Sequence, residues 1–416
     1  MLRVGLVQAK PGMVLAMPVF NPKRPDTPLL KSGVVLDRHM IQRLREVQAR
    51  EVWIEYPGLE FIANYVNPTI MSAQTEVIRQ ISSAFDLVLQ SASAPLEYYA
   101  YRTAVSDLID KLLDHPRACI FVQEMADADT PALRHASNVC MTSILIGLRL
   151  ESYLVTQRTR LSPSGAREIS GLGVGAMLHD VGMLQLDERV LRKWNDVHDE
   201  SDPKWREHVT IGYEMLKGNI EPTASAAVLH HHQHFDGSGF PKRRRLDSKL
   251  LPVQGDEIHV FARIVAAADL FDRIRHPNHA PLSEEHEDRS IPVVRALNLI
   301  QRPPYSHWID PMVLRGLMAV IPPYAPGSMV TLSNGESCVV TGFNPENPCR
   351  PTVAAIDVED GEIDVECLQR VNLLHRPDLH VVECDGVNTS ADNFYPTHAG
   401  QYDLDTAMKR LFNKVG

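Results

Sequence analysis

One short stretch of the sequence concentrates side chains that bind transition metals. Residues 230–236 read HHHQHFD, so four histidines and one aspartate fall within seven residues. Neutral imidazole and carboxylate groups are ligands that suit iron, manganese and zinc. The alternative interpretation of this stretch is a polar loop with scattered histidines. The glycines of the following GSGFP predict a sharp turn of the backbone. The density of ligands favours a metal site beside a tight turn.

Two aspartates elsewhere in the chain lie in apolar segments. Asp180 follows GAMLH, and Asp269 lies within an Ala/Val/Ile run. A buried carboxylate is costly unless a partner compensates its charge, so each is either a structural acid held by hydrogen bonds or part of a metal site. A two-metal site needs several imidazoles, a carboxylate that can bridge, and open positions for water and substrate. The side chains that supply this inventory are His135, His179, Asp180, His208, His231, His232 and Asp269.

These candidate ligands fall on five separate segments, each of which is expected to be helical. Apolar residues recur at helical spacing through most of residues 129–325. Asp129, Thr130 and Pro131 are typical of a helix start and shortly precede His135. Side chains on separate helices can meet in the core of a bundle. The centre of the chain is therefore expected to be a helical bundle with a metal site in its core.

The flanking regions are expected to be smaller and different in structure. Residues 1–68 alternate short apolar runs with turns around one helical run, which predicts an α+β module serving as scaffold or dimer contact. Residues 69–128 predict helices that either join the bundle or form a signalling connector. Residues 326–375 contain an Asn-Gly turn and predict a small β appendage, and residues 376–416 predict a polar tail. The expected fold class is mainly α.

Composition excludes several classes of function. The chain has 416 residues, 44% hydrophobic and 23% charged, with a formal net charge of −10, which argues against binding nucleic acid polymers or an anionic membrane surface. The six cysteines form no CxxC pair and are typical of reduced intracellular thiols. Neither a secretory apolar core nor a run of about 18 apolar residues occurs, so we expect no membrane span. The expected location is the cytoplasm.

Taken in order, these residues resemble a known family. The HD pair at 179–180, His208, HHQHFDGSGFP at 231–241 and Asp269 resemble the HD-GYP domain, a branch of the HD metal-dependent phosphohydrolases, whose signatures read HDxGK and HHExxDGxGYP. The resemblance covers about residues 129–325. The segment YAPGSMVTLSNGESCVV is similar to a tail that follows this domain in some members.

The resemblance implies a helical fold with a di-iron or di-manganese centre, sometimes trinuclear, and hydrolysis of cyclic di-GMP; the expected product is a linear dinucleotide, and further cleavage to GMP stays open. Carried over by position, it makes Asp180 the bridging ligand that orients a metal-bridging hydroxide for attack on phosphorus. The metal ligands that it implies are His135, His179, Asp180, His208, His231, His232 and Asp269.

Several residues depart from the family pattern. Met183 stands in place of the lysine of HDxGK, and Gln233 in place of the glutamate of HHE, where an amide can still hydrogen-bond beside the ligands. Phe240 replaces the tyrosine of GYP. Asn278 stands where the family carries an arginine, and Pro131 where members with three metals carry a glutamate, so we expect two metals.

The remaining polar residues of the pattern are candidates for contacts with substrate or partners. Arg275, together with Arg273, is a candidate to replace the missing arginine. Asp236, Gly237 and Gly239 are candidates to bind cyclic di-GMP or a protein partner through the GFP turn, with turn chemistry alone as the alternative. The histidines interpreted as not taking part are His230 and His234, and, as solvated loop residues, His276, His279 and His286.

Three functions stay open at this point. The leading one is a cyclic di-GMP phosphodiesterase, favoured by the complete ligand set. The second is a receptor or protein-interaction module with weak or no turnover, favoured by Met183 and Asn278 in place of cations. The third is a phosphohydrolase for another nucleotide. A homodimer through the N-terminal module or the helices also stays open.

Overall fold

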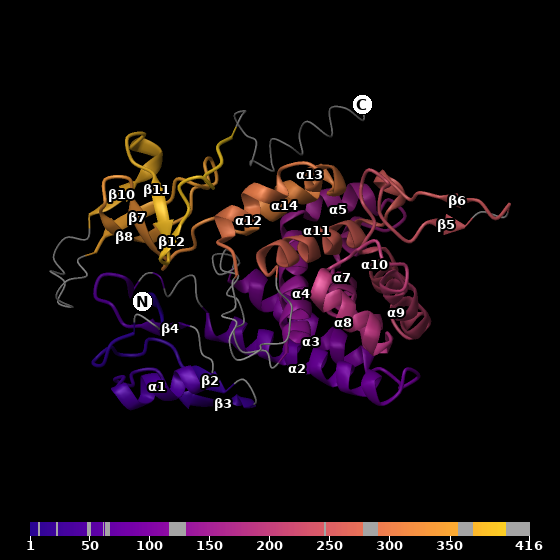
Figure 1. The fold of residues 1–416 in the computed structure, drawn as a ribbon, viewed down its shortest axis with the longest axis horizontal. Coiled ribbons are helices and arrows are strands. Elements are labelled where there is room, and N and C mark those ends of the chain that lie inside the picture. Colours follow the sequence, from indigo (N-terminus) through magenta and orange to yellow (C-terminus); the bar gives the residue numbers. More distant parts are fainter. Residues whose placement is uncertain are drawn as a thin grey trace.

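The fold is described from a computed structural model of the whole chain (Figure 1). The described residues are 1–6, 9–21, 24–47, 51–60, 62, 67–115, 130–244, 247–277, 290–356 and 369–396. Asp129, Asn278, His279 and His286, which the sequence analysis singled out, lie outside these ranges, as does the boundary placed at residue 128.

Helices dominate the described residues, as expected for a mainly α protein. Their bounds are α1 (Arg38–Glu46), α2 (Pro68–Gln90), α3 (Tyr98–Asp114), α4 (Pro131–Arg149), α5 (Glu151–Gln157), α6 (Pro163–Arg167), α7 (Ser170–Met177), α8 (Glu188–Val197), α9 (His208–Leu216), α10 (Pro222–His230), α11 (Val260–Arg275), α12 (Val293–Ile300), α13 (Tyr305–Trp308) and α14 (Pro311–Val320).

The strands form small sheets outside the bundle. A six-stranded sheet has the order β10-β9-β8-β7-β11-β12, and three pairs, β1-β4, β2-β3 and β5-β6, are antiparallel. The strand bounds are β1 (Leu2–Gly5), β2 (Val19–Asn21), β3 (Arg24–Leu30), β4 (Glu51–Ile54), β5 (Arg243–Arg244), β6 (Leu250–Leu251), β7 (Met329–Leu332), β8 (Ser337–Gly342), β9 (Thr352–Ala355), β10 (Arg370–Asn372), β11 (Val381–Cys384) and β12 (Val387–Asn388).

Helix α4 is the central helix of the bundle. Its N-cap is Thr130, whose side chain accepts a hydrogen bond from Leu133 N, and Pro131 occupies the first turn. Residues from Leu133 to Gly147 are buried almost without interruption, because α7, α11, α14 and α2 pack around the helix. A helix that is apolar on all sides belongs in the interior. This burial places His135 in the core.

Helix α7 approaches its neighbours closely because it is rich in glycine. A Cβ added at Gly173 would lie 2.4 Å from a methyl group of Val105 on α3, and one at Gly175 would lie 3.0 Å from the carbonyl oxygen of Ala224 on α10. Larger residues would push these helices apart. The close packing fixes the end of α7, from which His179 and Asp180 emerge.

Helices α2 and α3 are part of the bundle. They form an antiparallel pair, and Val77, Ile81, Val105 and Leu108 belong to the same buried cluster as Ile144 of α4. Of the two interpretations left open for residues 69–128, this packing favours bundle helices.

The C-terminal sheet extends further than the sequence predicts. The β appendage was expected to end at residue 375, but β11 and β12 continue the sheet to Asn388, and β11 pairs with the early strand β7. The strand residues VVEC are too few to give an alternating pattern, so the polar surroundings dominated the prediction.

The N-terminal module packs against this sheet. Leu15 and Trp53 share a buried cluster with Val339 of β8 and Ala354 of β9. Arg3 Nη2 lies 2.5 Å from Asp385 Oδ2, which joins β1 to the turn after β11. The N-terminal module and the C-terminal sheet therefore form one packed body beside the bundle, on the left in Figure 1.

The described helices were also compared with the length needed to cross a membrane. Taken singly, none is long and apolar enough; α4 and α5 would pass together, but they are bent by 84° relative to each other.

Candidate metal centre

The seven candidate ligands converge in the core of the bundle. His135 lies on α4, His179 and Asp180 follow α7, and His208 begins α9. The imidazoles are buried, whereas the Asp180 side chain is 28% exposed, more than its apolar surroundings in the sequence predicted. Exposure at this one carboxylate lets a ligand reach the centre. The remaining three are His231 and His232, just after α10, and Asp269 on α11.

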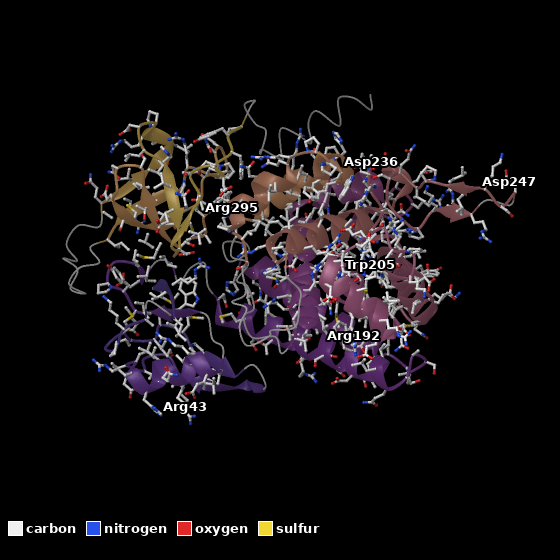
Figure 2. All side chains as sticks on the ribbon, viewed as in Figure 1. Arg43, Arg192, Trp205, Asp236, Asp247 and Arg295 are labelled. Carbon is white, nitrogen blue, oxygen red and sulfur yellow. The ribbon has the colours of Figure 1, made fainter. Side chains whose placement is uncertain are left out.

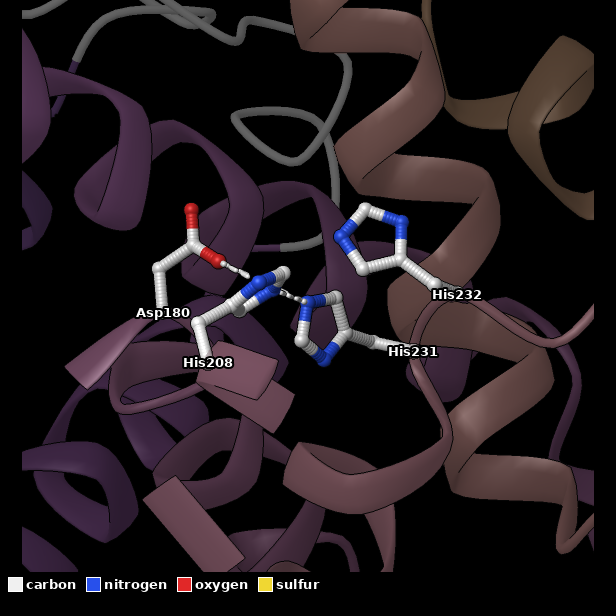
Figure 3. A group of neighbouring side chains, drawn as sticks. All are labelled: Asp180, His208, His231 and His232. Atoms are coloured by element: carbon white, nitrogen blue, oxygen red, sulfur yellow. Dashed lines mark hydrogen bonds and ion pairs between the residues drawn. The ribbon is translucent and has the colours of Figure 1, made fainter. Parts of the chain in front are cut away.

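The ligands form two groups, each of which could hold a metal ion. In each group the offered nitrogen and oxygen atoms lie within 4.8 Å of one another. The first group, here called the carboxylate-backed group, is His135, His179 and Asp269. The second, called the carbonyl-backed group, is Asp180, His208, His231 and His232 (Figure 3).

Asp180 lies between the two groups. Its Oδ2 is 3.5 Å from His179 Nε2 and 3.6 Å from His135 Nε2. Its Oδ1 is 3.5 Å from the Nε2 atoms of both His208 and His231. One oxygen of the carboxylate thus faces each group, which is the arrangement that a bridging ligand requires.

Backbone carbonyls fix the tautomer of three imidazoles. Nδ1 of His179 donates to the carbonyl oxygen of Ala176 (2.7 Å), Nδ1 of His208 to that of Trp205 (2.6 Å), and Nδ1 of His231 to that of Val228 (2.7 Å). In each case the acceptor lies three residues earlier, at a helix end or in a helical turn. Nε2 is left with its lone pair facing the centre.

Burial keeps the imidazoles of His179 and His208 neutral. It is the largest influence on both His179 and His208 and lowers the pKa of each to about 4. A neutral imidazole is the form that binds a metal ion.

His135 is held by a carboxylate instead of a carbonyl. Its Nδ1 lies 2.7 Å from Asp272 Oδ2, and the other oxygen of Asp272 accepts from Asn138 Nδ2 (2.8 Å). His276 Nδ1 lies 3.1 Å from Asp272 Oδ1, and its ring is buried. The interpretation of His276 as a solvated loop residue is therefore wrong. Asp272 was missed, although its place one helical turn after Asp269 puts both on one face of α11.

The donor set fits transition metal ions. His208 Nε2 and His231 Nε2 are 3.4 Å apart, and both rings carry their hydrogen on Nδ1. Two lone pairs that face each other at this distance repel unless a cation lies between the rings and Asp180. Imidazole and carboxylate together suit iron, manganese and zinc.

Comparison with known proteins agrees with this geometry. A family model described as HD domain matches residues 150–313. The chain is 26% identical over 337 residues to "Cyclic di-GMP phosphodiesterase PA4108" of Pseudomonas aeruginosa, covering 74% of each chain. It is also 26% identical over 258 residues to "Cyclic di-GMP phosphodiesterase response regulator RpfG" of Xanthomonas campestris, covering 61% of this chain and 59% of the relative. Residues 150–313 thus match an HD domain, and these relatives support the resemblance of the signature residues to its HD-GYP branch.

A third relative carries a different nucleotide in its name. "3'3'-cGAMP-specific phosphodiesterase 2" of Vibrio cholerae is 33% identical over 100 residues, which are 23% of this chain and 17% of the relative.

A cavity of about 310 Å³ lies beside the candidate metal ligands. His135, Asp180, His232 and Asp269 form one part of its lining, and Arg273 lies next to them. Ligand-binding cavities are largely apolar with a few polar groups at one end, as here. The other lining residues are Phe85, Thr130, Pro131, Ala132, Met183, Leu184, Leu191, Trp194, Asn195 and Trp205.

The glycine turn of the HD-GYP signature does not line this cavity. Asp236 Oδ1 accepts from Ser238 N (2.9 Å), and Gly237 has φ 83°. Figure 2 labels Asp236 apart from Trp205, which lies inside the bundle. Since Asp236, Gly237, Gly239 and Arg275 are all absent from the lining, this geometry gives no support to their expected contact with substrate.

The turn instead supports the ligands from behind. A Cβ added at Gly239 would lie 2.3 Å from the carbonyl oxygen of His232, so only glycine allows this approach. Gln233 Nε2 donates to the carbonyl oxygen of Pro241. The Phe240 ring stacks on His232, with ring centres 4.7 Å apart. The signature therefore holds His232 in place.

Proposed function

We propose that this chain is a metal-dependent phosphodiesterase that hydrolyses cyclic di-GMP to a linear dinucleotide and then to GMP. The observation that carries the proposal is the position of Asp180, with one oxygen facing each group of ligands. Two relatives that are named as cyclic di-GMP phosphodiesterases support the substrate.

In this proposal the two groups hold two ions of iron or manganese. Such ions lower the pKa of water and offset negative charge on a phosphate, which supplies the nucleophile and the stabilisation of the transition state. The metal ligands are His135, His179, Asp180, His208, His231, His232 and Asp269.

The protein's own part is to hold the ligands before substrate arrives. The three carbonyl-held imidazoles and the Asp272-held His135 keep their Nε2 atoms directed inward. Trp205, which is buried between His208 and His232, excludes water from behind the carbonyl-backed group. Ligands that need no rearrangement lower the barrier to reaction.

One observation favours a second candidate, a receptor that binds the nucleotide with little turnover. Met183 lines the cavity and carries no charge to contact a phosphate. A protein that lacks a positive charge at this position would keep its fold and its metal ions but hydrolyse the nucleotide slowly.

The test is turnover of cyclic di-GMP by protein purified without oxygen and loaded separately with ferrous iron and with manganese. The proposal expects linear dinucleotide, then GMP, from wild type and neither from Asp180→Ala prepared in the same way. Binding of cyclic di-GMP without turnover would establish the receptor. Faster hydrolysis of 3'3'-cGAMP than of cyclic di-GMP would overturn the proposed substrate.

A further inference from the structure

The cavity beside the metal ligands contains one permanent positive charge among its described lining residues. That residue is Arg273; the rest of the lining is apolar, polar but uncharged, or part of the two ligand groups. A substrate phosphate carries negative charge, and removing it from water is costly unless positive groups receive it. Apart from metal ions, Arg273 is the group placed to do so.

Arg273 is connected to the candidate ligands through the carboxylate of Asp269. Its Nη2 is 2.9 Å from Asp269 Oδ2, and the other oxygen of Asp269 is 3.2 Å from His135 Nε2. Its Nη1 is 2.6 Å from Glu200 Oε1, on the segment before α9. The guanidinium is thus fixed between the metal centre and Glu200.

The guanidinium retains hydrogen-bonding capacity after these two contacts. Arginine has five N–H donors in a planar fork, and Nε of Arg273 is buried without a hydrogen-bond partner. The side chain is 16% exposed. Because two carboxylates already hold it in one orientation, binding a phosphate would cost little further rotamer entropy.

Its charge is secure. A guanidinium group stays protonated in proteins, because its ordinary pKa lies above about 12. Arg273 is therefore a fixed cation at any physiological pH.

We propose that Arg273 binds the phosphate of the phosphodiester that enters the cavity, next to the metal centre. The inference rests on the proposed function and, of the two arginines that the sequence analysis named as candidates, assigns the phosphate contact to Arg273, which lines the cavity, and not to Arg275, which does not. Met183 lines the same cavity. A cation at position 183 would therefore reach the same space, and Arg273 supplies the charge that methionine lacks.

The competing explanation is structural. Arg273 could serve only to neutralise Asp269 and to anchor Glu200. In that case its loss would disturb metal binding, and a positive charge placed elsewhere in the cavity would not compensate.

Four variants separate the two explanations. Arg273→Met removes the charge, and Arg273→Gln removes it while keeping an amide donor for Asp269. Arg273→Met combined with Met183→Lys returns a cation to the cavity from another position. Arg192→Met is the matched control, because Arg192 is exposed on α8, pairs with Glu188 and lies outside the lining (Figure 2).

Three quantities are measured for each variant: metal per chain, KM and kcat for cyclic di-GMP, and the Kd for cyclic di-GMP by calorimetry of the metal-loaded protein. We expect KM and Kd to rise about tenfold to a hundredfold in Arg273→Met and Arg273→Gln, as for the loss of a charge-assisted hydrogen bond, with metal content unchanged. Met183→Lys should recover about tenfold of this loss. Arg192→Met should match wild type.

Unchanged Kd and KM in Arg273→Gln, or a loss of metal that Met183→Lys does not reverse, would overturn the inference. Because the Kd measures binding without hydrolysis, it tests the role of Arg273 separately from the proposed phosphodiesterase activity. If wild type binds cyclic di-GMP but does not hydrolyse it, the phosphodiesterase proposal fails while the binding series still decides the role of Arg273. If wild type neither binds nor hydrolyses cyclic di-GMP, both fail.

Discussion

The two groups of candidate ligands share Asp180 but are supported in different ways. In the carbonyl-backed group, Nδ1 of His208 and of His231 donates to a neutral backbone carbonyl. In the carboxylate-backed group, Nδ1 of His135 contacts the buried carboxylate of Asp272, and only the second imidazole, that of His179, donates to a backbone carbonyl. An imidazole that donates to a carboxylate is a stronger base and a stronger metal ligand than one that donates to a carbonyl.

The side chains that surround the two groups also differ in polarity. The carboxylate-backed group lies among charged and polar side chains, including Asp272, Arg273 and Asn138. The carbonyl-backed group lies against the aromatic rings of Trp205 and Phe240. In the proposed two-metal centre, one position would therefore depend in part on side chains that a mutation can remove, whereas the other would depend on the backbone and on packing.

The largest effect is expected from removing what the groups share. Asp180→Ala deletes both oxygens that lie between them, so we expect metal content to fall at both positions and turnover to drop by a factor of about a thousand or more, since the two-metal arrangement is lost. Elemental analysis and a turnover assay measure this. A variant that kept metal at both positions would show that Asp180 is not the bridge.

A smaller effect, confined to one group, is expected from Asp272→Asn. The amide keeps the shape of the side chain but removes the charge behind His135, so we expect metal affinity of the carboxylate-backed position to fall about tenfold to a hundredfold. Metal titration should then show one weak and one unchanged site. Asp86→Asn, an exposed acid on α2, is the matched control. Equal weakening of both sites would remove the distinction between the groups.

The aromatic support of the other group should affect stability more than metal binding. Phe240 stacks on His232, and the guanidinium of Arg206 lies 4.6 Å from the centre of the Phe240 ring. Phe240→Leu keeps apolar volume but loses both contacts, so we expect the free energy of unfolding to fall by about 1–2 kcal/mol with metal content unchanged. Denaturant unfolding measures the first and elemental analysis the second. Loss of metal would mean that the ring positions a ligand directly.

The smallest effect is expected at Asp236. Its carboxylate accepts from the backbone and hydroxyl of Ser238 and does not line the cavity. Asp236→Ala should therefore leave KM for cyclic di-GMP within about twofold of wild type and cost about 1 kcal/mol of stability at most. A KM that rose tenfold would place the turn in contact with substrate after all.

Much of the fold could be predicted because its signals are local. The helical spacing around Val77 and Val105, the cap at Thr130 and the apolar run that contains Asp269 each depend on residues close in sequence. The strand at 381–384 escaped detection because four residues carry too little pattern, and its pairing with β7 is a contact between distant parts of the chain.

In the candidate site, too, some residues could be predicted from the sequence and others depend on contacts between distant parts of the chain. The seven proposed ligands could be named because their residue types and order match a family pattern, and the structure brings them together. Asp272, His276 and the cavity position of Arg273 could not be found in this way, because each depends on which face of α11 meets α4 and the segment before α9. His276 was placed in a solvated loop and Arg273 was named only as a replacement for a missing arginine, because their partners come from packing and not from neighbouring residues.

The central claim is that Asp180 joins two metal positions in one centre. The measurement that tests it most directly is the number of metal ions per chain after anaerobic loading with ferrous iron, compared between wild type and Asp180→Ala, with folding of both checked by circular dichroism. The account predicts about two ions per wild-type chain, as a two-metal mechanism needs, and fewer than one in the variant. Equal metal content in the two proteins, or a wild type that binds none, would contradict it.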